Sequence, residues 1–120
     1  MPTALVVADS DWVVSDVQST LTAGDWEIEV LEDPAQAATK VEETSPDVVI
    51  IDLQVKNMGG MAVVRDIRAT VTADETPRLV MLLDRDADAF LAKRAGADAW
   101  VLKPFQAPEL RLALGLAPAV

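Results

Sequence analysis

The chain contains no cysteine and no histidine among its 120 residues, and these two absences exclude several kinds of chemistry. Without cysteine there is no disulfide framework, no thiolate metal site and no thiol nucleophile. Without histidine the chain lacks the commonest general base, the usual ligand of transition metals and the usual amino acid that carries a phosphoryl group on a ring nitrogen. Catalysis that depends on either side chain is therefore excluded.

Long apolar runs and positive charge are also scarce. No run approaches the roughly 20 residues of a membrane-spanning helix, and the first residues, Met1 to Ala4, lack the basic segment of a signal peptide. The 10 Lys and Arg against 20 Asp and Glu give a formal net charge of −10, which argues against a direct nucleic-acid partner because phosphate binding needs clustered Lys and Arg. Surplus acid permits a hard cation such as Mg²⁺ where carboxylates converge. We expect a cytoplasmic protein without membrane insertion.

Five short apolar runs alternate with segments of helical spacing along the whole chain. The expected strands are residues 4–8, 26–30, 48–51, 79–83 and 99–102. The expected helices are residues 11–23, 34–44, 61–71, 87–95 and 107–114. Such regular alternation predicts an α/β domain in which helices cover both faces of a parallel sheet. No linker interrupts the pattern, so residues 1–120 are expected to form one domain.

The stretch from Asp47 to Gly60 organises the rest of the chain. Its run of Val and Ile, residues 48–51, has no polar alternation and is typical of a strand buried on both faces. The run delivers one carboxylate, Asp52, and then breaks into a loop closed by two glycines. In parallel sheets that helices cover, binding and chemistry sit at the carboxyl ends of the strands, which is where Asp52 is expected.

Two further charged residues are expected at the carboxyl ends of other strands. Asp9 follows the first strand and Lys103 follows the fifth. In a doubly wound sheet of order 2-1-3-4-5, strands one and three are neighbours, so Asp9 and Asp52 would share a pocket that Lys103 faces. Mg²⁺ would relieve the repulsion between the two carboxylates, and the set could then attack and hold a phosphoryl group. Taken alone, Asp52 could instead be a carboxylate that caps the following loop.

Three stretches together resemble the receiver domain of bacterial two-component response regulators. They are Leu5-Val6-Val7-Ala8-Asp9, then Pro46 to Leu53 with Met58-Gly59-Gly60, and finally Ala95 to Phe105. Each stretch alone is a weak to moderate signal, but their order and spacing are similar to that family over the whole sequence. The resemblance implies a flavodoxin-like (CheY-like) fold of five βα units, and a signalling domain rather than an enzyme.

The resemblance also implies roles for individual residues. Asp52 would be the phosphoacceptor, and Asp9 and Asp52 would bind Mg²⁺ together with the backbone carbonyl of Gln54. Lys103 would contact the phosphoryl group, and the peptide bond that follows it is often cis in this family. Trp100 holds the place of the aromatic residue that changes rotamer on activation, although it could equally be a packing residue.

The sequence departs from the family pattern at the site itself. Ala8 replaces the first of two adjacent acids, and one ligand fewer should weaken Mg²⁺ binding; Asp11 could help, although we expect it to cap the following helix. At the end of the fourth strand, Leu83 or Leu82 stands where the family has a hydroxyl that binds the phosphoryl group. Asp84 stands where a small residue normally leaves room, and its carboxylate would repel that group.

Four leucines alternate near the C-terminus, which on its own suggests a strand, whereas the resemblance implies a helix. On a helix, Leu110 and Leu114 share one face, and Leu112 and Leu116 fall on another. Receiver domains commonly dimerise or meet partners through the fourth helix, fifth strand and fifth helix. Leu112 and Leu116 are expected to mark such a surface, unless they are merely scattered or covered by the terminal residues.

These observations favour a stand-alone receiver that accepts a phosphoryl group on Asp52 from a histidine kinase or phosphotransfer protein, with Mg²⁺. It would signal through contacts with a downstream protein, or through a homodimer. The alternative is an atypical receiver that is not phosphorylated and acts as a constitutive interaction module. A small flavodoxin-like enzyme is disfavoured, because no glycine-rich phosphate loop follows the first strand.

Overall fold

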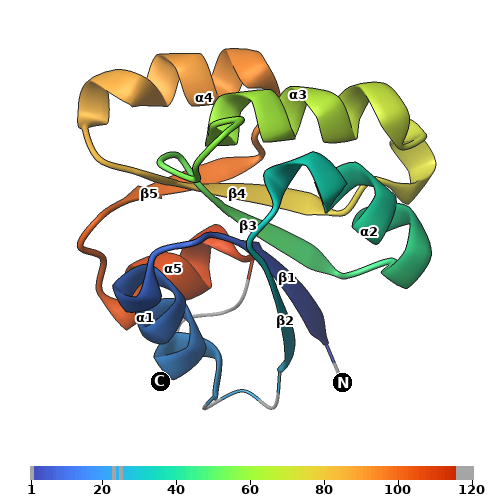
Figure 1. The fold of residues 1–120 in the computed structure, drawn as a ribbon. Coiled ribbons are helices and arrows are strands. Elements are labelled where there is room, and N and C mark those ends of the chain that lie inside the picture. Colours follow the sequence, from blue (N-terminus) through green and yellow to red (C-terminus); the bar gives the residue numbers. More distant parts are fainter. Residues whose placement is uncertain (1, 23, 25, 116–120) are drawn as a thin grey trace.

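A computed structural model, which describes residues 2–22, 24 and 26–115, contains one parallel sheet of five strands. The strands are β1 (Thr3–Val7), β2 (Glu27–Leu31), β3 (Val48–Asp52), β4 (Arg78–Leu83) and β5 (Ala99–Leu102). Their order in the sheet is β2-β1-β3-β4-β5 (Figure 1). The α/β fold and the strand order predicted from the sequence are therefore confirmed.

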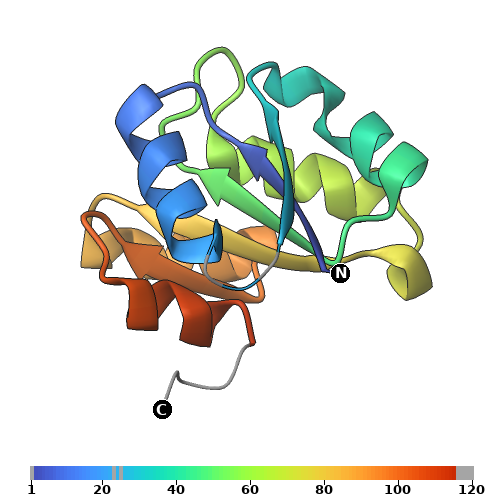
Figure 2. The same cartoon turned by 90° about the horizontal axis from the view of Figure 1, so that it is seen from below.

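Five α-helices cover the two faces of the sheet. They are α1 (Asp11–Thr22), α2 (Ala37–Thr44), α3 (Gly60–Thr70), α4 (Ala89–Ala95) and α5 (Ala107–Ala113). Helices α2, α3 and α4 lie on one face, and α1 and α5 lie side by side on the other (Figures 1 and 2). None of the helices in the described part of the chain has the length and apolar character that a bilayer span requires.

The burial of each strand follows its place in the sheet. All five residues of β3, the central strand, are buried, and its four apolar residues divide alternately between the hydrophobic clusters on the two faces. Strand β2 pairs only with β1 and is half-buried at alternate residues, as its apolar–polar alternation predicts for an edge strand. The apolar runs of β1, β3 and β4 thus belong to interior strands, whereas β5, which is also apolar, forms the second edge of the sheet.

Two helices start later than the sequence predicts, α2 by three residues and α4 by two. Asp33 is a cap, as predicted, since its Oδ1 accepts a hydrogen bond of 3.1 Å from the Ala35 N–H. A short 3₁₀ turn (Pro34–Gln36) then leads into α2, and another (Asp86–Asp88) precedes α4. The prediction that Asp11 caps α1 was wrong, because Asp11 is the first residue of the helix itself. Its negative charge there interacts favourably with the positive end of the helix dipole.

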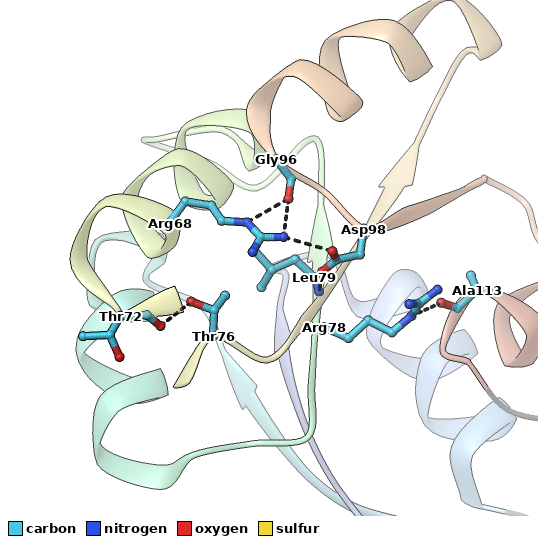
Figure 3. Close-up of polar contacts among 8 residues, drawn as sticks. All are labelled: Arg68, Thr72, Thr76, Arg78, Leu79, Gly96, Asp98 and Ala113. Atoms are coloured by element: carbon cyan, nitrogen blue, oxygen red, sulfur yellow. Dashed lines mark hydrogen bonds and ion pairs between the residues drawn. The ribbon is translucent and has the colours of Figure 1, made fainter. Parts of the chain in front are cut away.

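A polar network ties the elements together at the amino ends of β4 and β5 (Figure 3). Arg68 of α3 donates two hydrogen bonds to the Gly96 carbonyl and forms an ion pair of 3.1 Å with Asp98. Asp98 in turn accepts a 2.8 Å hydrogen bond from the Leu79 N–H. Arg78 donates to the carbonyl of the last residue of α5 at 2.7 Å. These contacts lie at the opposite end of the sheet from the candidate site.

Candidate functional site

Four neighbouring strands deliver polar side chains to one edge of the sheet. Asp52 is the last residue of β3, and Asp9, Asp84 and Lys103 come one or two residues after β1, β4 and β5. In the parallel register Val7 pairs with Ile51, so the ends of β1 and β3 are adjacent. The structure therefore brings to the carboxyl end of the sheet all the charged residues that the sequence analysis placed there.

Asp52 and Lys103 form a buried ion pair at the centre of this edge. The Lys103 Nζ donates to Asp52 Oδ1 at 2.5 Å, and the two side chains are 4% and 2% exposed. The backbone N–H of Gln54 donates a second hydrogen bond of 3.1 Å to the same oxygen. A carboxylate this deeply buried requires such partners, because an unpaired buried charge costs several kcal/mol. The pair therefore fixes the orientation of the Asp52 carboxylate.

Asp84 provides a second carboxylate for the same lysine. Its Oδ1 lies 3.2 Å from the Lys103 Nζ, and its Oδ2 accepts a hydrogen bond of 2.9 Å from the side-chain amide of Gln54. The sequence analysis expected Asp84 only to repel a phosphoryl group. In the structure its carboxylate also pairs with Lys103, the lysine expected to contact that group. The role of the Gln54 side chain was missed, since the resemblance concerned only its backbone carbonyl.

Trp12 covers the lysine from the first turn of α1. The Lys103 Nζ lies 5.9 Å from the centre of its ring, within the range of a cation–π contact, although Trp12 is 52% exposed. The sequence analysis treated Trp12 as a packing or surface aromatic and missed this contact. The only feature of the sequence that could have indicated this contact is the short distance along the chain between Asp9 and Trp12, which places Trp12 near the same edge of the sheet.

Asp9 is held toward the loop after β3. Its Oδ2 accepts a hydrogen bond of 2.9 Å from the Lys56 backbone N–H, while the Lys56 residue itself is exposed. Among the described residues, Asp9 Oδ1 and Asp52 Oδ2 take part in no hydrogen bond. With the backbone carbonyl of Gln54 these oxygens are the hard donors that Mg²⁺ prefers. The donor set fits this ion, but it is small, since the buried Ala8 contributes no oxygen.

Within the ranges 2–22, 24 and 26–115, no three acidic side chains are grouped closely enough to hold a metal by themselves. The two carboxylates and one carbonyl would have to be completed by water or by phosphoryl oxygens.

Gly60 allows the start of α3 to approach the end of β3. A Cβ atom at this position would lie 2.7 Å from the Asp52 carbonyl oxygen and 2.8 Å from the Leu53 Cα. The sequence analysis gave the glycine pair only the role of building the turn. That role holds for Gly59, which has a φ of +80°, whereas Gly60 is needed for close packing beneath the site.

The residues expected to couple the site to a surface are apolar. Leu82 and Leu83 are both fully buried, and β4 ends at Leu83. Trp100 is half-buried and packs against the hydrophobic cluster that contains Leu83. The peptide bond between Lys103 and Pro104 is cis. Because β4 ends in Leu82 and Leu83, the last two residues of this strand offer no hydroxyl to Trp100.

The leucines of α5 divide between core and surface. Leu110 and Leu114 are buried, whereas Leu112 is 64% exposed. Leu116 lies outside the described residues. Other large apolar side chains exposed on α4 and β5 are Phe90, Leu91 and Leu102.

Comparison with known proteins identifies the family to which the sequence is similar. The family model described as the response regulator receiver domain matches residues 4–115. The chain is 34% identical over 109 residues to the DNA-binding response regulator MtrA of Mycolicibacterium smegmatis, across 88% of this chain and 46% of MtrA. It thus spans about half the length of the curated relatives that it matches.

Solved structures show the same fold. The chain is similar to the chemotaxis protein CheY4 of Vibrio cholerae, with a TM-score of 0.82 and 29% identity over 96% of this chain and 97% of that chain. It also resembles the receiver domain of sensor histidine kinase PA1611 from Pseudomonas aeruginosa, solved with magnesium in its active-site cleft. That likeness has a TM-score of 0.80 at 22% identity, over 95% and 98% of the two chains, and concerns the fold alone.

The order of the strands, the charged residues at their carboxyl ends and the match over residues 4–115 lead to one conclusion. This chain belongs to the receiver domain family of two-component response regulators.

Proposed function

We propose that residues 1–120 act as a receiver domain that accepts a phosphoryl group on Asp52 from a histidine kinase or phosphotransfer protein, with Mg²⁺ as cofactor. The observation that carries the proposal is the buried ion pair of 2.5 Å between Asp52 and Lys103 at the end of the central strand. A carboxylate oriented by an ammonium and a backbone N–H is positioned to attack phosphorus while a cation lies beside it.

In the proposed reaction, a carboxylate oxygen of Asp52 attacks the phosphorus of a phosphohistidine. A P–O bond forms as the P–N bond breaks, and the imidazole nitrogen leaves with the bonding electron pair. Lys103 pairs with a phosphoryl oxygen, and the Gln54 N–H keeps the carboxylate in place. Mg²⁺, held by Asp9, Asp52 and the Gln54 carbonyl, would neutralise charge on the phosphoryl oxygens.

A second candidate function is that of a constitutive interaction module without phosphorylation. The observation that favours it is the contact of Asp84 with both Lys103 and Gln54, which gives the lysine a second carboxylate partner in the absence of a phosphoryl group. Ala8 and Leu83 also favour the interaction module. Ala8 provides no metal ligand, and Leu83 provides no hydroxyl to bind a phosphoryl group.

The output surface of either form would include α4, β5 and α5. Exposed Leu112 supports this, as do the exposed apolar side chains on the neighbouring elements. A downstream protein or a second copy of the chain could cover this face. Replacing Leu112 and Leu116 by alanine is expected to weaken self-association or partner binding, measured by light scattering or pull-down. An alanine pair that left both unchanged would count against this surface.

Phosphorylation by acetyl phosphate, with and without Mg²⁺, tests the leading function. Intact mass should show one added phosphoryl group only when Mg²⁺ is present, and none in Asp52→Ala. No gain in mass, together with no measurable Mg²⁺ binding, would instead favour the constitutive module.

A further inference from the structure

Lys103 already has three partners among this chain's own side chains. An ammonium group has three N–H donors and no acceptor. In the structure the Nζ donates to Asp52 Oδ1 at 2.5 Å, and it lies 3.2 Å from Asp84 Oδ1 and 5.9 Å from the centre of the Trp12 ring. A phosphoryl oxygen that binds the lysine therefore competes with these groups, and above all with the two carboxylates.

The two carboxylates differ in how easily they can leave. The side chain of Asp52 is 2% exposed and belongs to the central strand, so it cannot move into water. The side chain of Asp84 is 38% exposed and lies just beyond the end of β4. Partly exposed ion pairs contribute little, because water and salt screen them. Asp84 is thus the partner that a phosphoryl group would displace.

Asp84 also connects three loops. One carboxylate oxygen binds Lys103 after β5, and the other binds the Gln54 side chain after β3, while Asp84 itself begins the turn that leads to α4. That turn is closed internally by a 3.0 Å ion pair between Arg85 and Asp88, and this carboxylate raises the pKa of Arg85. Release of Asp84 would therefore remove the side-chain contacts by which this turn is joined to the loops after β3 and β5.

We propose that Asp84 is a built-in carboxylate that occupies the phosphate-contacting lysine and is expelled when Asp52 is phosphorylated. The phosphoryl group brings negative charge beside Asp84 and competes for Lys103. Expulsion breaks the contact with Gln54 and frees the turn before α4. A chain whose β4 ends in Leu83 would thus signal by repulsion of a carboxylate, without a hydroxyl. The inference rests on the proposed phosphorylation of Asp52.

The test compares Asp84→Ala with Asp86→Ala, a control that removes the same charge from an exposed residue of the same turn. With acetyl phosphate and Mg²⁺, Asp84→Ala is expected to be phosphorylated about tenfold faster than the unchanged chain, since one repulsive charge and one competitor are gone. Asp86→Ala should react at nearly the unchanged rate. Nuclear magnetic resonance of the Gln54 side-chain amide provides a second readout. Phosphorylation of the unchanged chain should shift this signal toward its position in Asp84→Ala.

The outcomes separate the two proposals. Equal phosphorylation rates in all three proteins, or a Gln54 amide signal that neither phosphorylation nor Asp84→Ala shifts, would overturn the expulsion of Asp84 while leaving phosphorylation of Asp52 intact. If none of the three takes up a phosphoryl group, the proposed function fails, and the expulsion fails with it.

Discussion

At the scale of single residues, the site combines one cation with three carboxylates that play different parts. Asp52 is buried against Lys103, Asp84 pairs with the same lysine from the edge, and Asp9 is turned toward the loop after β3. Because burial decides how strongly a charge depends on its partner, the Asp52–Lys103 pair should matter most for stability.

Replacing Lys103 by methionine tests this difference in burial. The change leaves the Asp52 carboxylate buried without its ammonium, and we expect the free energy of unfolding to fall by about 3 kcal/mol. Lys40→Met is a matched control, because Lys40 pairs with Glu29 at 3.2 Å through side chains that are 31% and 50% exposed. That loss should be below about 1 kcal/mol. Urea unfolding measures the loss of unfolding free energy in both variants. Equal losses would contradict the greater importance of the Asp52–Lys103 pair for stability.

At the scale of elements, α5 shows what a sequence pattern can and cannot establish. The alternating leucines are compatible with a strand, and only the resemblance to a family indicated a helix. The helix is confirmed for residues Ala107–Ala113, with Leu110 and Leu114 toward the core and Leu112 toward solvent. Helical spacing thus predicts the inward face once the type of element is known.

Leu110→Ala and Leu112→Ala probe the two faces of α5 with the same chemical change. Leu110 is fully buried, so its truncation leaves a cavity and should cost about 3 kcal/mol of unfolding free energy. Truncation of Leu112 should change it by no more than about 0.5 kcal/mol. Urea denaturation provides the values. A loss at position 112 as large as that at position 110 would mean that this leucine is packed.

Most of the fold and the positions of the site residues could be predicted from the sequence, whereas the contacts among side chains could not. The apolar runs predict the strands, and a parallel sheet places their polar ends at one edge. The cation–π contact of Trp12 and the link between Gln54 and Asp84 join residues far apart in sequence. Such contacts depend on side-chain conformations, which periodicity does not determine. Gly60 was misjudged for the same reason, since only the packing reveals what a Cβ would meet.

At the scale of the whole molecule, the net charge of −10 favours divalent cations in general, so a specific Mg²⁺ site must be separated from that background. An ion that binds the folded state but not the unfolded state raises the unfolding temperature by mass action. The site at the sheet edge should therefore make the thermal stability of the entire chain depend on Mg²⁺.

Ala8→Asp adds the missing acid beside Asp9 and should tighten Mg²⁺ binding by about tenfold, because Mg²⁺ affinity rises with the number of carboxylate ligands. Without Mg²⁺ the variant should be less stable than the unchanged chain, since the new carboxylate is buried near other acids. Ala8→Asn has the same shape without the charge. Calorimetry with and without Mg²⁺ measures the effect. An identical Mg²⁺-dependent rise in Tm for all three proteins would show that the ion does not bind at this site.

Chemical trapping of the phosphorylated residue tests the central claim most directly. The protein would be treated with acetyl phosphate and Mg²⁺ and then with borohydride, which reduces an aspartyl phosphate to homoserine, and peptide mass spectrometry would locate the product. We predict homoserine at position 52 alone, and none when Mg²⁺ is chelated. Homoserine at another aspartate, or at none, would contradict the assignment of Asp52 as the phosphoacceptor.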